Sequence, residues 1–285
     1  MKKEELPFDV DLKGKVAVVT GAGGFICSTL ASALAACGAK VALLDLREEK
    51  AQEKADEIVK EGYIAKGYGC NVLDRAGLEE THKRILNDFG PCDILINGAG
   101  GNNPRATTDN EFASEHDLDE GTKSFFGLED SGIQFVFNLN ILGTLLPTQV
   151  FAADMIKAKK GNIINISSMN AFTPLTKIPA YSAAKAGVSN LTKWLAVYFS
   201  KMNIRVNAVA PGFLVTAQNQ ALLYNPDGTP TARTAKILRN TPMERFGKLE
   251  ELVGGFLFFV SDKASSFITG VVLPIDGGFS AYSGV

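Results

Sequence analysis

The stretch "KVAVVTGAGGFICST" (Lys15–Thr29) joins a run of β-branched residues to a glycine-rich turn and then to the start of a segment rich in Ala and Leu. Consecutive apolar residues over Lys15–Thr20 predict a strand that is buried on both faces, and residues from about 24 to 37 predict a helix. The turn between them is tight because it contains Gly21, Gly23 and Gly24. This region therefore predicts a strand, a glycine turn and a helix in succession.

The same alternation of short apolar runs and longer helical patterns continues along the 285 residues. Further strands are predicted at Lys40–Leu46, Tyr63–Val72, Asp93–Gly98, Asn162–Ser168, Ile204–Pro211 and Gly270–Gly277. Helices are predicted at about 24–37, 48–61, 75–88, 133–159, 179–201 and 249–260. Several strands are apolar at successive positions, as expected when helices cover both faces of a parallel sheet. We therefore expect one α/β domain over residues 1–285, with a doubly wound, seven-stranded parallel sheet that binds ligands beyond the carboxyl ends of its strands.

The composition excludes several classes of protein. With 29 basic and 31 acidic residues the formal charge is −2, which leaves no basic excess for a nucleic-acid or membrane-surface protein. No apolar run approaches the roughly 20 residues that span a bilayer, and the charged segment at residues 1–15 lacks the apolar core of a secretory signal. The chain has four cysteines, and none of them forms a C-x-x-C pair: Cys27, Cys37, Cys70 and Cys92. They predict no metal site and a reduced, cytoplasmic protein.

Two long segments interrupt the pattern, one from Asn102 to about Gly132 and one from Thr216 to about Arg245. The first contains eight acidic residues and only two basic ones. Excursions of this length at the carboxyl edge are typical of lids or substrate loops, and solvated surface decoration is the alternative. The acidic part, "DNEFASEHDLDE", could instead hold a divalent ion, although a solvated loop is favoured.

The position of the glycine turn suggests a ligand for it. The turn lies at a helix N-terminus, where backbone N–H groups and the helix dipole favour a phosphate. Asp45 ends the second predicted strand, 24 residues after Gly21. A carboxylate there can accept hydrogen bonds from an adenosine ribose and would repel a 2′-phosphate. Leu46 follows, so no arginine immediately offsets that repulsion, although Arg47 lies close. The sequence predicts a dinucleotide site that prefers NAD, with a plain strand-end turn at Asp45 as the alternative.

A second motif carries acid–base chemistry. In "AYSAAKAG", Tyr181 and Lys185 are four residues apart, and therefore share one face of a predicted helix. Ser168 ends the strand "NIINISS" thirteen residues earlier, at the carboxyl edge. An ammonium beside a buried phenol stabilises the phenolate, which brings a pKa of about 10 closer to neutrality. These three residues predict a proton-transfer site.

These segments resemble the short-chain dehydrogenase/reductase family over essentially the whole chain. Further matches are "NGAG" (Asn97–Gly100), "NLNILG" around Asn140, "RVNAVAPG" and "PIDGG" (Pro274–Gly278). The resemblance implies a Rossmann domain and an NAD-dependent carbonyl/alcohol oxidoreductase. A non-catalytic nucleotide-binding protein on the same fold is the alternative, whereas a zinc-dependent dehydrogenase is disfavoured because the chain has only two histidines.

The family pattern assigns roles to individual side chains. It implies that Tyr181 is the general acid/base, that Ser168 orients the substrate carbonyl and that Lys185 holds the nicotinamide ribose and lowers the tyrosine pKa. Asn140 would fix a water that relays protons. The implied cofactor contacts are Gly21, Gly23, Gly24, Phe25, Ile26, Asp45, Leu46, Asn71, Val72, Asn97, Ala99, Gly100, Tyr181, Lys185, Pro211, Gly212, Leu214 and Thr216.

The chain departs from the family pattern at several positions. Phe25 and Cys27 replace two glycines of the turn, and Gly98 replaces the second Asn of N-N-A-G. Asn71 stands where the family usually has Asp. We expect the chemistry to be retained, with the first helix seated differently to accommodate Cys27.

The substrate is predicted from the segment "GGNNPRATTDNEF" (Gly100–Phe112), which follows the fourth predicted strand and so opens beside the nicotinamide. It presents Asn102, Asn103 and Arg105, and Asn170 faces it from the loop after the catalytic serine. Amides suit several hydroxyls and a guanidinium suits a carboxylate, so a sugar acid is expected. The alternative for the guanidinium is a pair with the acidic segment, in which case Lys177 or Arg233 would be the next carboxylate ligands to test.

The same segment, together with "GGFIC" in the turn, also resembles short-chain enzymes that interconvert fructuronate and mannonate. Gluconate 5-dehydrogenases and polyol dehydrogenases are the near alternatives. The predicted helices at 133–159 and 179–201 contain more apolar residues than one sheet contact can bury. We therefore expect a homo-oligomer, and the resemblance implies a homotetramer in which these helices pair between subunits.

Overall fold

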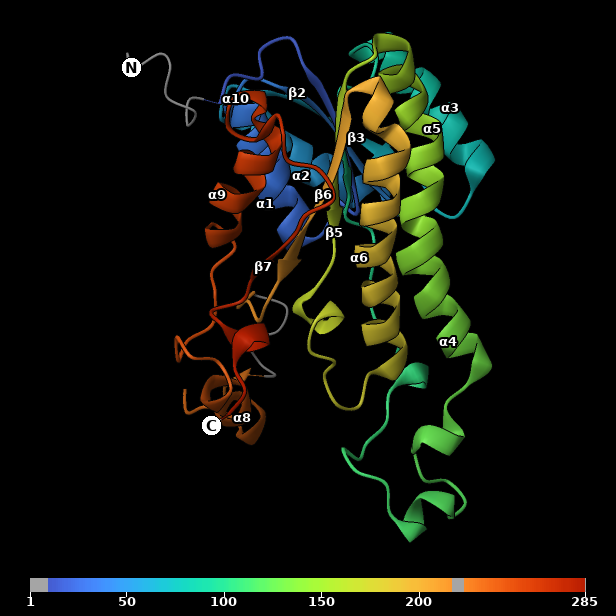
Figure 1. Cartoon of the computed structure of the whole chain (residues 1–285), viewed down its shortest axis with the longest axis vertical. Coiled ribbons are helices and arrows are strands. Elements are labelled where there is room, and N and C mark those ends of the chain that lie inside the picture. The colour runs from blue at the N-terminus through green and yellow to red at the C-terminus, as the bar shows by residue number, and fades with distance from the viewer. Residues whose placement is uncertain (1–9, 217–222, 285) are drawn as a thin grey trace.

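The computed structural model describes residues 10–216 and 223–284. A seven-stranded parallel sheet lies at its centre, in the order β3-β2-β1-β4-β5-β6-β7 (Figure 1). The strands are β1 (Val16–Thr20), β2 (Lys40–Asp45), β3 (Ile64–Gly69), β4 (Ile94–Asn97), β5 (Gly161–Ile166), β6 (Ile204–Pro211) and β7 (Val272–Ile275). The strand order reverses between β1 and β4, so the segments that leave these two strands diverge and open a crevice. The predicted doubly wound parallel sheet is confirmed.

Helices cover both faces of this sheet. One face carries α1 (Phe25–Ala36), α2 (Glu48–Lys60) and α9 (Glu251–Val260), followed by the short α10 (Asp262–Ser265). The other carries α3 (Arg75–Asp88), α5 (Gly143–Ala158) and α6 (Pro179–Phe199). Every residue of β1 is buried, because its alternate side chains face different helix layers. This explains why the strands are apolar at successive positions.

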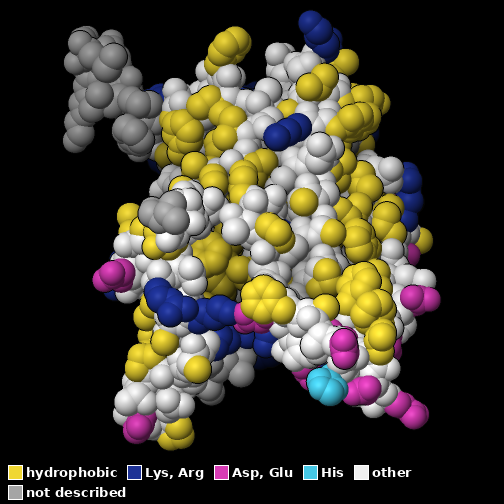
Figure 2. Space-filling model, turned by 60° about the horizontal axis from the view of Figure 1, so that its bottom comes forward, with side chains coloured by type: hydrophobic (Ala, Val, Ile, Leu, Met, Phe, Trp, Pro, Cys, Tyr) yellow, Lys and Arg dark blue, Asp and Glu magenta, His cyan; other side chains and the backbone are white. Residues whose placement is uncertain are grey.

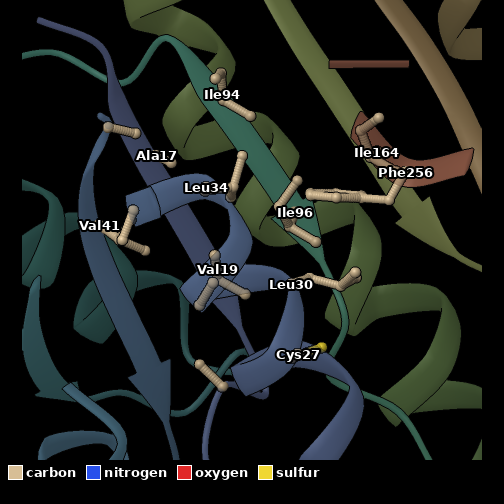
Figure 3. Packing of buried hydrophobic residues seen from close by; sticks show 14 of the residues in the cluster. Ala17, Val19, Cys27, Leu30, Leu34, Val41, Ile94, Ile96, Ile164 and Phe256 are labelled. Carbon is tan, nitrogen blue, oxygen red and sulfur yellow. The ribbon is translucent and has the colours of Figure 1, made fainter. Parts of the chain in front are cut away.

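The packing of α1 shows how the glycine turn is held against the sheet. Leu30 and Leu34 are completely buried, and they lie against Val19 of β1 and Ile96 of β4 (Figure 3). Phe256 of α9 belongs to the same core cluster as α1. Burying side chains of this size stabilises a fold by about 1.5–3 kcal/mol each. The start of α1 is therefore fixed relative to both β1 and β4.

The helix that leads into the sheet from the first insertion contains an irregular turn. It consists of α4 (Asp130–Phe137), a π-helical turn η5 (Asn138–Leu142) and α5 (Gly143–Ala158). By length and composition alone this helix of 29 residues, which contains an 18-residue window with a mean hydropathy of 1.4, could cross a membrane, but half of that window is buried inside the protein. Phe151 and Met155 of α5 are buried against the sheet. The apolar composition therefore belongs to a helix that covers the sheet.

Both insertions lie beyond the carboxyl edge of the sheet (Figure 1). The first contains the short helices η2 (Pro104–Ala106), η3 (Glu115–Leu118) and η4 (Phe125–Gly127). The second contains α8 (Ala232–Arg239), whose first turn is capped by the hydroxyl of Thr231; residues 217–222 lie outside the described residues. Three further short helices are η6 (Met169–Ala171), η7 (Ser200–Met202) and η8 (Phe279–Ala281).

Cys27 and Gly98, two departures from the family pattern, lie against each other in the structure. Cys27, on the first turn of α1, is 4% exposed and faces Gly98 at the end of β4. A Cβ atom on Gly98 would lie 2.0 Å from the Sγ of Cys27. We expected α1 to be seated differently in order to accommodate Cys27, but the structure accommodates the thiol through the missing side chain at position 98. Burial also raises the pKa of this thiol to about 12, so it acts as a small apolar group.

This contact generates a stability prediction. Gly98→Ala should lower the free energy of unfolding by about 1–3 kcal/mol, because the added methyl overlaps Cys27 and the Thr20 carbonyl. Cys27→Ala in the same chain should recover part of that loss, which urea unfolding of the single and double variants would measure. Gly101→Ala is the matched control, since its Cβ would meet only Leu139, at 3.8 Å. Equal losses at the two glycines would contradict the assignment.

Candidate active site

Neighbouring elements bring four of the predicted residues together at the carboxyl edge. Ser168 follows β5, and Tyr181 and Lys185 lie on the first two turns of α6. The helix begins at Pro179, which suits a first helical position because proline lacks the N–H that would be unpaired there. Asn140 comes from the π-helical turn η5. The site is therefore assembled from two helices and one strand end.

The Ser168 hydroxyl accepts a hydrogen bond from the backbone N–H of Asn170 at 3.2 Å and faces the Tyr181 phenol. The pKa of Tyr181 is raised, because burial disfavours the phenolate more than the neighbouring Ser168 hydroxyl favours it. The family resemblance implied a pKa lowered by Lys185, and the structure differs on this point. The Lys185 ammonium lies 5.7 Å from the centre of the tyrosine ring and donates to a backbone carbonyl instead.

Lys185 is itself deeply buried, with only 4% of its surface exposed. Its Nζ donates to the Ile166 carbonyl at 2.8 Å. Burial lowers the pKa of this ammonium to about 8, so it still carries its charge at neutral pH. A Cβ on Gly100 would lie 3.1 Å from this Nζ and 2.7 Å from Oδ1 of Asn140. Glycine at position 100 therefore lets the segment after β4 pass directly over the site.

Asn140 fastens that segment to the helix. Its Nδ2 donates to the carbonyls of Val136, at 2.7 Å, and Gly101, at 2.8 Å, while its Oδ1 accepts from the Gly101 N–H at 3.3 Å. The π-helical turn leaves the geometry of a regular helix at this residue, and such turns occur frequently at functional sites. The water-holding role implied for Asn140 stays a prediction.

The glycine turn and Asp45 form the second part of the site. Gly21 has a φ of +67° and its Cβ would lie 2.9 Å from the backbone of Ala99, so the left-handed turn and the close approach both require glycine. The N–H groups of Gly23 and Arg47 each donate to the Asp45 carboxylate at 3.1 Å. Gly24 precedes α1 without a side-chain cap, and the first turn of α1 contains no acidic residue. These features fit the phosphates and ribose of a dinucleotide.

The other implied cofactor residues follow the crevice with different roles. The Asn97 amide donates to Thr148 and Asn165, both at 2.9 Å, so this side chain is engaged inside the protein. Asn71 accepts from the N–H of Leu73 at 3.0 Å, and Val72 is buried beside Gly143. Three residues remain accessible: Phe25 (37% exposed) and the partly exposed Ile26 in the first turn of α1, and Leu46 (73% exposed) directly after β2. Pro211, Gly212, Leu214 and Thr216 continue from the end of β6.

The structure separates the predicted substrate residues into two groups. Asn102 donates to Thr107, Asn103 caps the backbone of η2, and the Arg105 guanidinium lies 3.8 Å from Glu129. These three side chains therefore make local contacts. Arg105 pairs with an acidic residue of its own insertion, which was the alternative to binding a substrate carboxylate. Asn170 differs, since it is 5% exposed and its Oδ1 has no hydrogen-bond partner among the described residues.

Sequence reasoning missed one contact at the mouth of the site. Glu111, on the first insertion, forms an ion pair with Lys236 of α8, which belongs to the second insertion. The two residues are 125 positions apart, so no local spacing could have revealed the pair. The only signal available was the opposite charge of the two insertions. Across the described ranges 10–216 and 223–284, no group of three or more His, Cys, Asp or Glu side chains could hold a metal ion.

Comparisons with known proteins agree with this geometry. A family model described as short chain dehydrogenase matches residues 15–226. An uncharacterized oxidoreductase of Haemophilus influenzae is 62% identical over 275 residues, covering 96% of each chain. The uncharacterized oxidoreductase UxuB of Bacillus subtilis is 49% identical over 280 residues, which is 98% of this chain and all of the relative.

Solved structures are similar over nearly the whole chain. A crystal structure of a proposed D-mannonate oxidoreductase from Haemophilus influenzae with bound NAD has a TM-score of 0.92 and 62% identity, covering 96% of this chain and 98% of the other. A gluconate 5-dehydrogenase from Burkholderia cenocepacia, in complex with NADP and tartrate, has a TM-score of 0.81 and 29% identity, covering 96% and 98%.

The arrangement predicts the effect of removing one oxygen atom. Tyr181→Phe should lower turnover by about 10²–10⁴-fold, because positioned acid–base groups contribute that much, while dinucleotide binding stays nearly unchanged. Steady-state rates and fluorescence titration with NADH would measure the two effects separately. Tyr63→Phe, at an exposed position just before β3, is the matched control. Retention of more than about a tenth of the rate by Tyr181→Phe would contradict the assignment.

Proposed function

The chain belongs to the short-chain dehydrogenase/reductase family, whose members are oxidoreductases that act on CH–OH groups, and we propose that it interconverts a secondary alcohol and a ketone on a sugar acid with NAD(H). The observation that carries this proposal is the grouping of the buried Ser168, the half-buried Tyr181 and the buried, charged Lys185 at the carboxyl edge of the sheet. A non-catalytic nucleotide-binding protein would have no use for a buried ammonium near a half-buried phenol, because desolvation makes that arrangement costly.

The chain's own residues account for the proton transfer. Bound NADH would supply the hydride. The Ser168 hydroxyl holds the substrate oxygen beside the Tyr181 phenol, which is kept protonated by burial and can give its proton as charge develops on that oxygen. The neighbouring Ser168 hydroxyl favours the phenolate that remains. In the oxidative direction the same phenolate takes the proton from the alcohol.

The substrate we propose is the D-fructuronate/D-mannonate pair. One observation supports it, the 62% identity to a proposed D-mannonate oxidoreductase. A gluconate 5-dehydrogenase-like activity is the alternative, supported by the similar structure of that enzyme. Arg105 remains a proposed carboxylate ligand only if its weak contact with Glu129 opens.

We also propose that the protein is a homotetramer located in the cytoplasm. Five large apolar side chains are exposed along α5, α6 and the turn before them: Leu142, Ile156, Trp194, Val197 and Tyr198. An apolar face of this kind normally has a protein partner, and pairing of these helices between subunits would bury it. All four thiols are free, which suits a reducing compartment.

The position of Asp45 predicts the choice of cofactor. The kcat/KM for NADH should exceed that for NADPH more than about tenfold, because a 2′-phosphate would approach the Asp45 carboxylate with like charge. Asp45→Ala combined with Leu46→Arg should weaken or invert the preference, whereas Asp56→Ala on α2 should leave it unchanged. Equal values for the two cofactors in the unmodified enzyme would refute the prediction.

A substrate screen tests the proposed reaction directly. Hexuronates, aldonates and neutral polyols should be compared in both directions by absorbance of NADH. We expect the highest kcat/KM for a carboxylated sugar, with D-fructuronate and D-mannonate ahead of 5-ketogluconate and gluconate. A neutral polyol that outperforms every carboxylated sugar would overturn the sugar-acid assignment.

A further inference from the structure

The Glu111–Lys236 ion pair joins the two insertions. The first insertion leaves the sheet after β4 and the second leaves it after β6, and β5 lies between these two strands. Ser168 follows β5 with one residue between, so it leaves the carboxyl edge of the sheet between the two insertions. The ion pair therefore connects the segments on either side of the candidate catalytic serine.

Lys177 supplies a second cation, whose charge acts on Glu111. It lies four residues before Tyr181, and its carbonyl accepts a hydrogen bond from the N–H of Thr108 at 2.9 Å, which ties the first insertion to the loop before α6. Its φ is +72°, a left-handed conformation that costs an L-residue of this kind about 1–2 kcal/mol. The hydrogen bond from Lys236 is the main cause that lowers the pKa of Glu111, and the charge of Lys177 adds to it. Two ammonium groups thus act on one carboxylate.

The charged side chains around the ion pair are also separated by sign, with basic residues on the second insertion and acidic residues on the first. Among the residues of α8, Arg233, Lys236 and Arg239 are basic and none is acidic, whereas the first insertion is strongly acidic. Figure 2 shows basic side chains gathered on one side of the carboxyl edge and acidic side chains mainly on the other. Glu111 is the acidic side chain that reaches across to the basic side. An anionic substrate would be attracted to the same cations.

We propose that Glu111 is an internal latch that occupies the place of the substrate carboxylate on Lys236 and Lys177, and that a sugar acid enters by displacing it. This inference rests on the proposed function and specifies which residues recognise the acid group. The latch is suited to exchange, because half of the Lys236 side chain is exposed and ion pairs in such positions are weak. A neutral polyol has no group that could displace the carboxylate.

The latch predicts opposite effects for the two partners of one ion pair. Glu111→Gln removes the competitor and should lower KM for D-mannonate by about three- to fivefold. Lys236→Met removes the ligand and should raise that KM by about tenfold or more, and Lys177→Met should raise it less. The KM for D-mannitol, which has CH₂OH in place of the carboxylate, should stay within about twofold in all three variants, as should the dissociation constant for NADH.

Matched controls separate this role from a structural one. Glu115→Gln neutralises a carboxylate of the same insertion that pairs with no cation in the described residues, and Lys201→Met removes a charge at the opposite edge of the sheet. The exchanged pair Glu111→Lys with Lys236→Glu keeps the ion pair but reverses it. If the pair only fastens the insertions together, the exchanged enzyme should regain the wild-type KM; if Lys236 binds the substrate, KM for D-mannonate should remain high.

Two results would overturn the latch. One is a rise in KM for D-mannonate in both Glu111→Gln and Lys236→Met, and the other is recovery of the wild-type KM in the exchanged pair. The sugar-acid proposal fails by a different result, a preference of the unmodified enzyme for D-mannitol over D-mannonate, and the latch fails with it. Preference for D-mannonate with opposite shifts in the two variants would support both.

Discussion

The close contact between the turn after β1 and the segment after β4 is the constraint on which the rest of the site depends. The Thr20 hydroxyl accepts hydrogen bonds from the N–H groups of Gly98, at 3.0 Å, and Ala99, at 3.2 Å. Gly21 can lie against Ala99 only because it has no side chain. Since the strand order reverses here, this contact sets the width of the crevice and places the glycine turn opposite the catalytic helix.

Behind the catalytic residues, a chain of buried polar groups holds the sheet to its helices. The Asn97 amide bonds to Thr148 of α5 and Asn165 of β5, and the Asn165 amide bonds to Thr192 of α6. Buried hydrogen-bond networks of this kind favour one arrangement of their elements, although the Asn97 Oδ1 itself has no hydrogen-bond partner among the described residues. The network therefore positions α6, and with it the phenol and ammonium whose pKa values burial shifts.

Catalysis and selectivity are built from different parts of the chain. The residues that we propose for proton transfer lie on elements packed into the core, where desolvation shifts their pKa values. The insertions that flank them meet through the Glu111–Lys236 ion pair. Ion pairs near the surface are screened by salt and change partners easily. Such a division allows the insertions to change substrate preference while the chemistry stays constant, as the different substrates of structurally similar family members require.

The sequence by itself determined the parallel α/β sheet, the glycine turn and the grouping of Ser168, Tyr181 and Lys185, because periodicity, turn chemistry and helical spacing are local properties. It could not reveal that Cys27 and Gly98 share one space, since those residues are far apart in the chain and meet only when β1 and β4 pair. Nor could it place Arg105 beside Glu129 or Glu111 beside Lys236. The raised pKa of Tyr181 was likewise decided by tertiary structure, because desolvation depends on everything packed around a group and charge partners depend on where each side chain points.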